Sequence, residues 1–190
     1  MPERTNRRDN IIEAATNLFI RQGYSATSVQ QIADAVGCTK AALYYHFTEG
    51  KREILQAVLE HSIPDFVAIL EACKDARSAG DLVKQLGTQL VTGLGRPRAE
   101  RLHWITSEFP QFGPEERALF YNKYLAFHRK LTQMMTDFVQ DEAKADSLAW
   151  VLMCAMAGYV QMFWHLDVVS VMDYTTDQFL ESVANLMATQ

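Results

Sequence analysis

Apolar residues recur at the three- and four-residue spacing of an α-helix along almost the whole chain. Residues 5–22 show the pattern first, with Ile11, Ala15 and Phe19 on one face and Gly23 placed to end the helix. No window shows the sustained two-residue alternation of a half-buried strand. The pattern therefore predicts an all-α protein of about nine helices.

A second, shorter helix is predicted after this glycine. The stretch Thr27-Ser28-Val29-Gln30 fits a capping box, in which we expect the Thr27 hydroxyl to cap the helix and Gln30 to reach back to the cap. Gly37 ends the helix after about nine residues. Both ends of the helix are thus marked in the sequence.

The rest of the chain continues as helices separated by clear breaks. Residues 51–73 are expected to form one long kinked helix or two in line, because the Pro64 ring removes a backbone hydrogen bond and clashes with the preceding turn. Further helices are expected over 79–94, 98–108, 114–140, 144–165 and 176–188. We expect a first domain over 1–52, joined by the long helix to a second over 53–190.

Composition and charge agree with a soluble globular protein whose two ends differ. Hydrophobic residues make up 48% of the 190 residues and charged residues 22%, far from the composition of disordered chains. The net charge is −5, but residues 1–52 hold seven basic and five acidic side chains, a net of +2, which leaves −7 for the rest. This asymmetry favours a basic contact surface near the N-terminus.

Several kinds of chemistry are not expected. The three cysteines lie far apart without a Cys-x-x-Cys pair, and no histidine has a partner at i+4, so we expect neither a disulfide framework nor a metal site. No nucleophilic or phosphate-binding motif points to an enzyme or a cofactor. The polar start lacks the apolar stretch of a secretory signal, so we expect a cytoplasmic protein.

The third predicted helix, residues 40–47, carries the functional hypothesis. The tight turn 36–39 joins it to the second helix, and Thr39 can cap it, as in a DNA-reading helix-turn-helix. Leu43 and Phe47 point inward, and the remaining positions suit close approach to a duplex: Lys40, Ala41, Ala42, Tyr44, Tyr45 and His46. An ordinary helical hairpin with two exposed tyrosines fits the same pattern.

Residues 32–47, IADAVGCTKAALYYHF, are what separates the two interpretations. With the residues before them they resemble, without a gap over about 8–47, the N-terminal domain of TetR-family (tetracycline-repressor-like) regulators. The resemblance implies a helix-turn-helix motif over about 28–47 and DNA-contacting roles for Thr27, Ser28, Thr39, Lys40, Ala41, Ala42, Tyr44, Tyr45, His46 and Lys51. Two departures are Ala41, where the family often has glycine, and the three residues 48–50 before Lys51, where two are common.

The second half carries an aromatic stripe at helical spacing. The simplest interpretation is that this stripe forms part of the hydrophobic core. The alternative is that it lines an apolar pocket for a planar or lipophilic ligand. The candidate lining residues are Trp104, Phe109, Phe112, Phe120, Tyr124, Phe127, His128 and Met134.

Residues 148–160 contain no charged or strongly polar side chain. The stretch is shorter than the roughly 20 residues of a membrane span, so we expect a helix that protein covers on all sides. With the last helix it resembles the two-helix interface through which TetR-family members dimerise. The candidate interface residues are Leu148, Leu152, Ala155, Tyr159, Phe179, Val183 and Met187.

The sequence thus predicts a homodimeric repressor that binds a palindromic double-stranded DNA operator and is released by a small, apolar or aromatic effector. Two alternatives stay open. One is an activator or an effector-independent DNA binder with a filled core. The other is a helical small-molecule carrier that has lost DNA binding.

Overall fold

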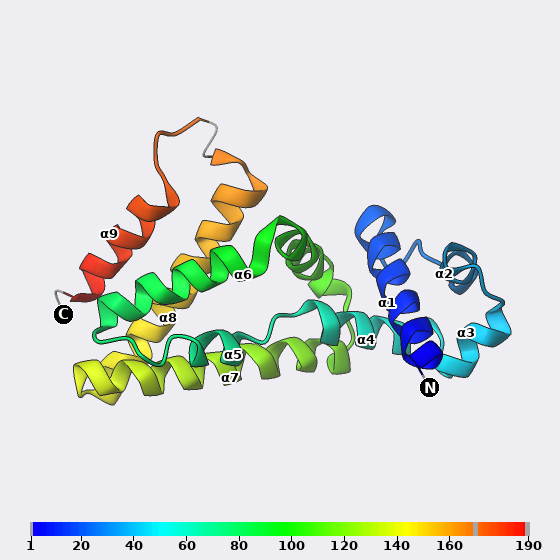
Figure 1. Ribbon diagram of the computed structural model, residues 1–190, viewed down its shortest axis with the longest axis horizontal. Coiled ribbons are helices and arrows are strands. Elements are labelled where there is room, and N and C mark those ends of the chain that lie inside the picture. The colour runs from blue at the N-terminus through cyan, green and yellow to red at the C-terminus, as the bar shows by residue number, and fades with distance from the viewer. Residues whose placement is uncertain (1, 169–170, 189–190) are drawn as a thin grey trace. The chain divides into compact units, whose positions relative to one another are not determined.

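The computed structural model describes residues 2–168 and 171–188, and every regular element within them is helical. The elements are α1 Pro2–Gln22, α2 Val29–Val36, α3 Lys40–His46, α4 Lys51–Ser62, α5 Phe66–Glu71, α6 Ala79–Glu108, a 3-10 turn η1 Phe109–Gln111, α7 Pro114–Val139, α8 Glu142–Tyr159, a π-helical turn η2 Val160–His165 and α9 Thr176–Ala188 (Figure 1). The predicted all-α fold of nine α-helices is confirmed for the described residues.

One predicted break is confirmed, and one predicted boundary differs from the structure. Residues 79–108 are two helices that meet at a kink at Gly95, with φ 58° and ψ 167°, inside the break expected between residues 94 and 98. That backbone conformation is essentially restricted to glycine, so Gly95 separates the two helical stretches of α6. The helix expected over 144–165 is regular only to Tyr159 and then widens into η2.

The chain folds into two compact units. The first contains the residues up to Ile63 together with Glu100–Phe120, and the second contains Pro64–Ala99 together with the residues from Tyr121 onward. The chain therefore passes between the units three times. The C-terminal part of α6 and the first residues of α7 belong to the same unit as α1–α4.

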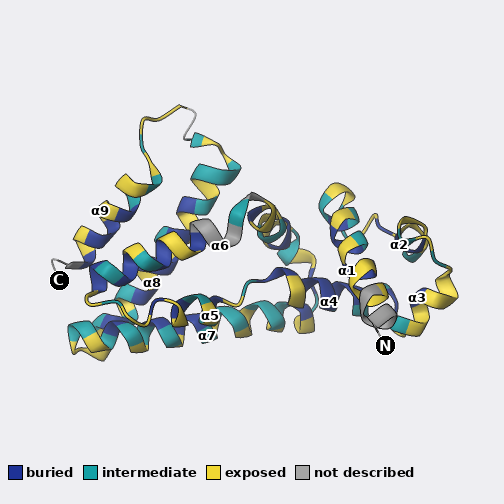
Figure 2. Cartoon of the chain, in the orientation of Figure 1, coloured by how far each residue is buried: buried dark blue, intermediate teal, exposed yellow. Residues whose placement is uncertain are grey.

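The core of the first unit is built from the predicted inner faces. Helix α1 packs on α2 and α4, and α2 packs on α3. Ile11, Phe19, Leu43 and Phe47 are fully buried, and Figure 2 shows such positions as dark stripes on helices with exposed outer faces. Trp104 closes this core, since its ring stacks on Phe19 with the centroids 5.6 Å apart.

The second unit packs its helices through small residues as well as large ones. Leu86 on α6 and Leu131 on α7 are fully buried, and α8 packs on α9. Gly87 allows a close approach of α6 to α9, because a Cβ atom at this position would lie 2.1 Å from Leu180 Cδ2. A small apolar cavity of about 10 Å³ adjoins this contact, lined in part by Tyr159.

Candidate nucleic-acid interface

Helices α2 and α3 are joined by a tight turn that is fixed by backbone hydrogen bonds and by the cap of α3. Gly37 adopts a left-handed conformation, φ 67°, and donates its N–H to Asp34 O, while Cys38 N–H donates to Ala33 O at 2.9 Å. This pair of bonds is the Schellman motif that ends helices at a left-handed glycine. Thr39 then caps α3, its Oγ1 accepting from Ala42 N at 3.2 Å.

The start of α2 differs from the prediction by one residue. Ser28, not Thr27, is the N-cap, and Gln31, not Gln30, completes the capping box, with Ser28 N–H donating to Gln31 Oε1 at 2.7 Å. Thr27 is 1% exposed and its hydroxyl donates to Gly23 O at 2.9 Å, which fastens the end of α1. Ser28 is the member of this predicted pair that stands at the surface.

The two sides of α3 are divided as the sequence predicts. Leu43 and the following Phe47 are 0% exposed, so the helix is held by its inner side. The outer side carries a cation, two small residues and two tyrosines, with Tyr44 44% and Tyr45 64% exposed, and half-buried His46 adjoins them. The residues on this outer side are Lys40, Ala41, Ala42, Tyr44 and Tyr45. Their contact with DNA stays a prediction.

The extra residue before α4 has a structural role. Gly50 has φ 66°, and a Cβ atom there would lie 3.0 Å from Cε1 of Tyr44. A larger residue would therefore displace the Tyr44 ring and adopt a strained backbone. The three-residue connection supports the position of Tyr44 on α3.

Lys51 is engaged within the protein. Its ammonium donates to Thr27 O at 2.9 Å, to Tyr24 O at 3.0 Å and to Ser25 O at 3.4 Å, and it lies 4.3 Å from the centroid of the Tyr24 ring. Burial lowers the pKa of Lys51. Lys51 therefore fastens the segment before α2, and its three N–H groups already have acceptors that a DNA phosphate would have to replace.

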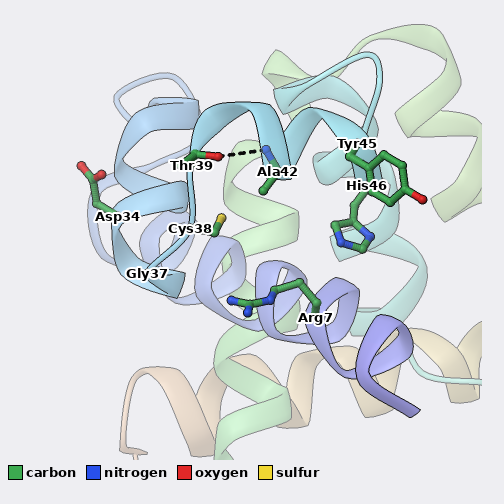
Figure 3. A pocket seen from close by; sticks show the side chains of 8 residues that line it. All are labelled: Arg7, Asp34, Gly37, Cys38, Thr39, Ala42, Tyr45 and His46. Atoms are coloured by element: carbon green, nitrogen blue, oxygen red, sulfur yellow. Dashed lines mark hydrogen bonds between the residues drawn. The ribbon is translucent and has the colours of Figure 1, made fainter. Parts of the chain in front are cut away.

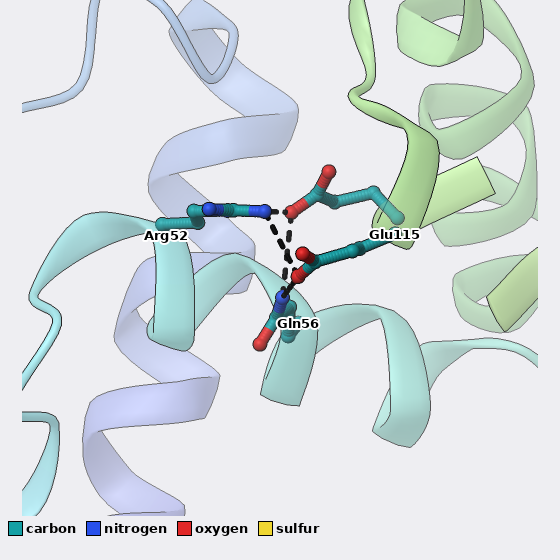
Figure 4. A network of polar contacts seen from close by, with 4 residues as sticks. Arg52, Gln56 and Glu115 are labelled. Atoms are coloured by element: carbon teal, nitrogen blue, oxygen red, sulfur yellow. Dashed lines mark hydrogen bonds and ion pairs between the residues drawn. The ribbon is translucent and has the colours of Figure 1, made fainter. Parts of the chain in front are cut away.

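Arg52, the next residue, joins α4 to the start of α7 (Figure 4). Its guanidinium lies 2.8 Å from Glu115 Oε2 and 3.2 Å from Glu116 Oε1, and Gln56 Nε2 donates to Glu115 at 3.2 Å. Glu116 is 4% exposed, so Arg52 and Gln56 supply hydrogen bonds that water cannot give to its buried carboxylate. Burial and the Glu116 charge together raise the pKa of Tyr24, against the smaller effect of Arg52. Sequence reasoning missed this cluster because its members lie about 60 residues apart.

The predicted ligand-lining residues fall in both units. Trp104, Phe109, Phe112 and Phe120 belong to the first unit, and Tyr124, Phe127, His128 and Met134 belong to the second. In the first, the Phe109 ring contacts Phe112 and Phe120 with centroids 6.2 and 5.1 Å apart. The Trp104 indole N–H is buried and has no hydrogen-bond partner among the described residues.

Within the second unit, the other four make contacts of their own. Tyr124 and Phe127 pack on Phe66, and burial raises the pKa of Tyr124 to about 12. His128 stacks on Trp150 with the ring centroids 4.2 Å apart. Met134 is half-buried.

Several predicted interface residues face their own unit. Leu152, Tyr159, Val183 and Met187 are at most 8% exposed, whereas Leu148, Ala155 and Phe179 are half-buried. The outward apolar side chains are different ones: Val151 is 57%, Met162 47% and Leu186 68% exposed. Cys154 and Gly158 lie exposed between the first two along α8.

The segment Glu142–His165 is long and apolar enough to cross a membrane by length and composition alone, and 22% of its most apolar window is buried. Helices of soluble proteins can pass the same test. The low burial means that this segment, in the second unit, presents apolar surface that the described residues do not cover.

Sequence comparison finds relatives of the first unit among known proteins. Residues 11–58 match the model of bacterial regulatory proteins of the tetR family. The transcriptional regulator LmrA of Bacillus subtilis is 39% identical over 87 residues, covering 43% of this chain and 46% of LmrA. ArpR of Pseudomonas putida, a probable transcriptional regulator, is 36% identical over 139 residues, covering 70% of this chain and 66% of ArpR.

The fold has relatives along its whole length. The crystal structure of AibR with isovaleryl coenzyme A and operator DNA aligns with a TM-score of 0.66 and 20% identity, over 96% of this chain and 98% of AibR. At that identity the likeness concerns the fold alone. The alignments with the first curated relatives cover 46%, 24% and 38% of those proteins, so the chain spans less than half of their length.

Proposed function

The chain belongs to the TetR family of bacterial regulatory proteins, whose members are transcriptional regulators and not enzymes, and on that premise we propose that it is a repressor. It binds a palindromic operator in the bacterial cytoplasm as a homodimer and leaves the operator when a small molecule binds. The observation that carries the proposal is the two-sided α3. Its inner side is fixed by buried Leu43, while its outer side combines Lys40, two alanines and exposed tyrosines.

The dimer is supported by the apolar surface of α8, η2 and α9. Val151, Met162 and Leu186 are each about half exposed or more, and exposed apolar patches of this kind mark interaction sites. A second copy of the chain covers them and presents two α3 helices to one duplex. Two α3 helices separated by one turn of the DNA duplex, about 34 Å, or by a multiple of it would enter successive major grooves of a palindrome.

A charge placed on this surface tests the dimer. We expect Val151→Glu to give a monomer in sedimentation equilibrium and to lose operator affinity, because a carboxylate would be buried in the interface. Leu125→Glu is the matched control, since Leu125 is 46% exposed on α7 and distant along the chain from the proposed interface. A Val151→Glu protein that stays dimeric would contradict this interface.

The effector is proposed to be apolar or aromatic and to offer a hydrogen-bond acceptor. The buried Trp104 indole N–H has no acceptor among the residues that the structure describes, which costs about 1–3 kcal/mol. The Phe112 ring contacts the Trp104 ring, and the Phe109 ring contacts Phe112. A ligand acceptor at Nε1 would recover that energy. AibR, of similar fold, is known with both a small molecule and operator DNA, which supports a ligand-responsive function of this kind.

Selection of bound duplexes from a random DNA pool, at two salt concentrations, tests DNA recognition. We expect an enriched palindrome whose binding is weakened by Lys40→Ala and Tyr45→Ala and unchanged by Lys74→Ala, an exposed residue in the turn after α5. Enrichment without release by any effector that the protein binds would favour the effector-independent binder or the activator. Small-molecule binding without DNA affinity would favour the carrier.

A further inference from the structure

An open groove of about 780 Å³ runs between α1 and the helix-turn-helix (Figure 3). Its lining includes Thr39, Ala42, Tyr45 and His46, which are four of the residues expected to contact DNA. From the α1 side the lining includes Arg7, whose side chain reaches toward the part of the groove that carries the α2–α3 turn. A cation from a different helix therefore lies beside the reading surface.

Arg7 differs in what it contacts from three neighbouring cations, Arg8, Lys51 and Arg52. Arg8 lies 5.0 Å from the centroid of the Phe47 ring, Lys51 donates to carbonyl oxygens, and Arg52 pairs with carboxylates. Arg7 is exposed, and no hydrogen bond or ion pair joins its side chain to a side chain that the structure describes. Within that set of residues, its guanidinium has no contact to give up when it binds an anion.

The position of Arg7 is set by regular structure. Helix α1 extends from Pro2, one turn earlier than the sequence pattern predicts, so Arg7 stands in its second turn and not in a terminal arm. The helix packs on α2 and α4, which fixes the backbone of Arg7 relative to α3. A guanidinium on a fixed helix loses less entropy on binding a phosphate than one on a mobile arm, because the backbone is already ordered.

We propose that Arg7 binds a phosphate of the DNA backbone beside the major groove that α3 reads. This inference rests on the proposed function and adds a contact that the recognition helix does not supply. Asp34 is the one carboxylate among the described lining residues. It accepts from Gln30 Nε2 at 2.6 Å, and its side chain points away from Arg7 in Figure 3. The phosphate therefore lies on the Arg7 side of the groove, and the contact adds affinity without adding sequence preference.

The salt dependence of operator binding tests the contact. Each phosphate neutralised by the protein adds about 0.9 to the slope of log affinity against log salt, so Arg7→Gln in both subunits of a dimer lowers the slope by about 1.8. Arg21→Gln removes the same charge from the other end of α1 and is the matched control, expected to leave the slope unchanged. Arg7→Lys, which keeps the charge, is expected to keep most of the slope.

Specificity is measured in the same experiment by comparing the selected duplex with an unrelated one. We expect the affinity ratio of the two duplexes to be equal in wild type and Arg7→Gln, with equal circular dichroism and thermal midpoints. An Arg7→Gln slope equal to that of Arg21→Gln would overturn the Arg7 contact, and a changed affinity ratio would overturn its assignment to the backbone.

The two proposals fail in different ways. If the wild-type protein binds duplexes without any preference, the proposed operator recognition fails, while the slope difference between the Arg7 and Arg21 variants still decides the phosphate contact. If the wild-type protein binds no duplex at either salt concentration, both proposals are refuted.

Discussion

Replacing Lys51 by methionine separates the two roles considered for this residue. The sequence resemblance implies a contact with the DNA backbone, whereas the structure places the ammonium against three carbonyl oxygens of residues 24–27. Methionine keeps the apolar stem of the side chain and removes every N–H donor. The substitution therefore tests whether the Lys51 ammonium binds the carbonyl oxygens of the protein or a phosphate of the DNA.

The size of the expected effect follows from the geometry. Burial lowers the pKa of Lys51, because desolvation works against the charged ammonium, and the hydrogen bonds to the carbonyl oxygens offset that cost. The two short bonds, at 2.9 and 3.0 Å, contribute about 1 kcal/mol each, and the bond at 3.4 Å contributes little. We expect Lys51→Met to lower the free energy of unfolding by about 2 kcal/mol.

Urea denaturation of the full chain measures this loss, with all variants at one protein concentration because a dimer's stability depends on it. Lys74→Met is the control, since Lys74 is exposed in the turn after α5. The salt slope of DNA binding should be the same in both variants and in the wild type. Unchanged denaturation together with a slope reduced by about 0.9 per subunit would refute the internal role and restore the phosphate contact.

Three further changes test other contacts. Gly87→Ala should lower the free energy of unfolding by about 1–3 kcal/mol in denaturant titrations, because the added Cβ would lie 2.1 Å from a Leu180 methyl group, and Leu180→Ala should relieve the clash. Tyr124, with a pKa raised to about 12, stays protonated in the folded state while the unfolded state ionises near 10, so stability should fall between pH 10 and 12 and fall less in Tyr124→Phe. Glu116→Ala should reduce the thermal midpoint more than Glu116→Gln, whose amide oxygen still accepts from Arg52.

Helix positions were predictable because local patterns determine them. Apolar spacing, Gly37 and Pro64 place the helices and breaks around α2–α5. The register of the α2 cap was not predictable, since Thr27 with Gln30 and Ser28 with Gln31 have the same spacing. Tertiary packing decides between them by burying Thr27.

The outward side of α8 was not predictable for a related reason. A helix that is apolar all round gives no contrast between its faces, so periodicity cannot tell which stripe lies inside. The sequence predicts Leu152 and Tyr159 in the interface, and both are buried within the second unit, while Val151 is exposed. The phase of the helix is set by packing against other helices, which sequence spacing does not contain.

Residues 1–52, the DNA-binding domain in our proposal, depend on a segment far away in the chain. Phe19 is fully buried and stacks on Trp104, and Arg101 pairs with Glu13 at 3.0 Å. A fragment ending at residue 52 would expose the Phe19 ring and leave Arg52 without its carboxylates. The helix-turn-helix is therefore a local motif in the sequence but part of a larger folding unit, because the residues that complete its core follow it by about fifty positions or more.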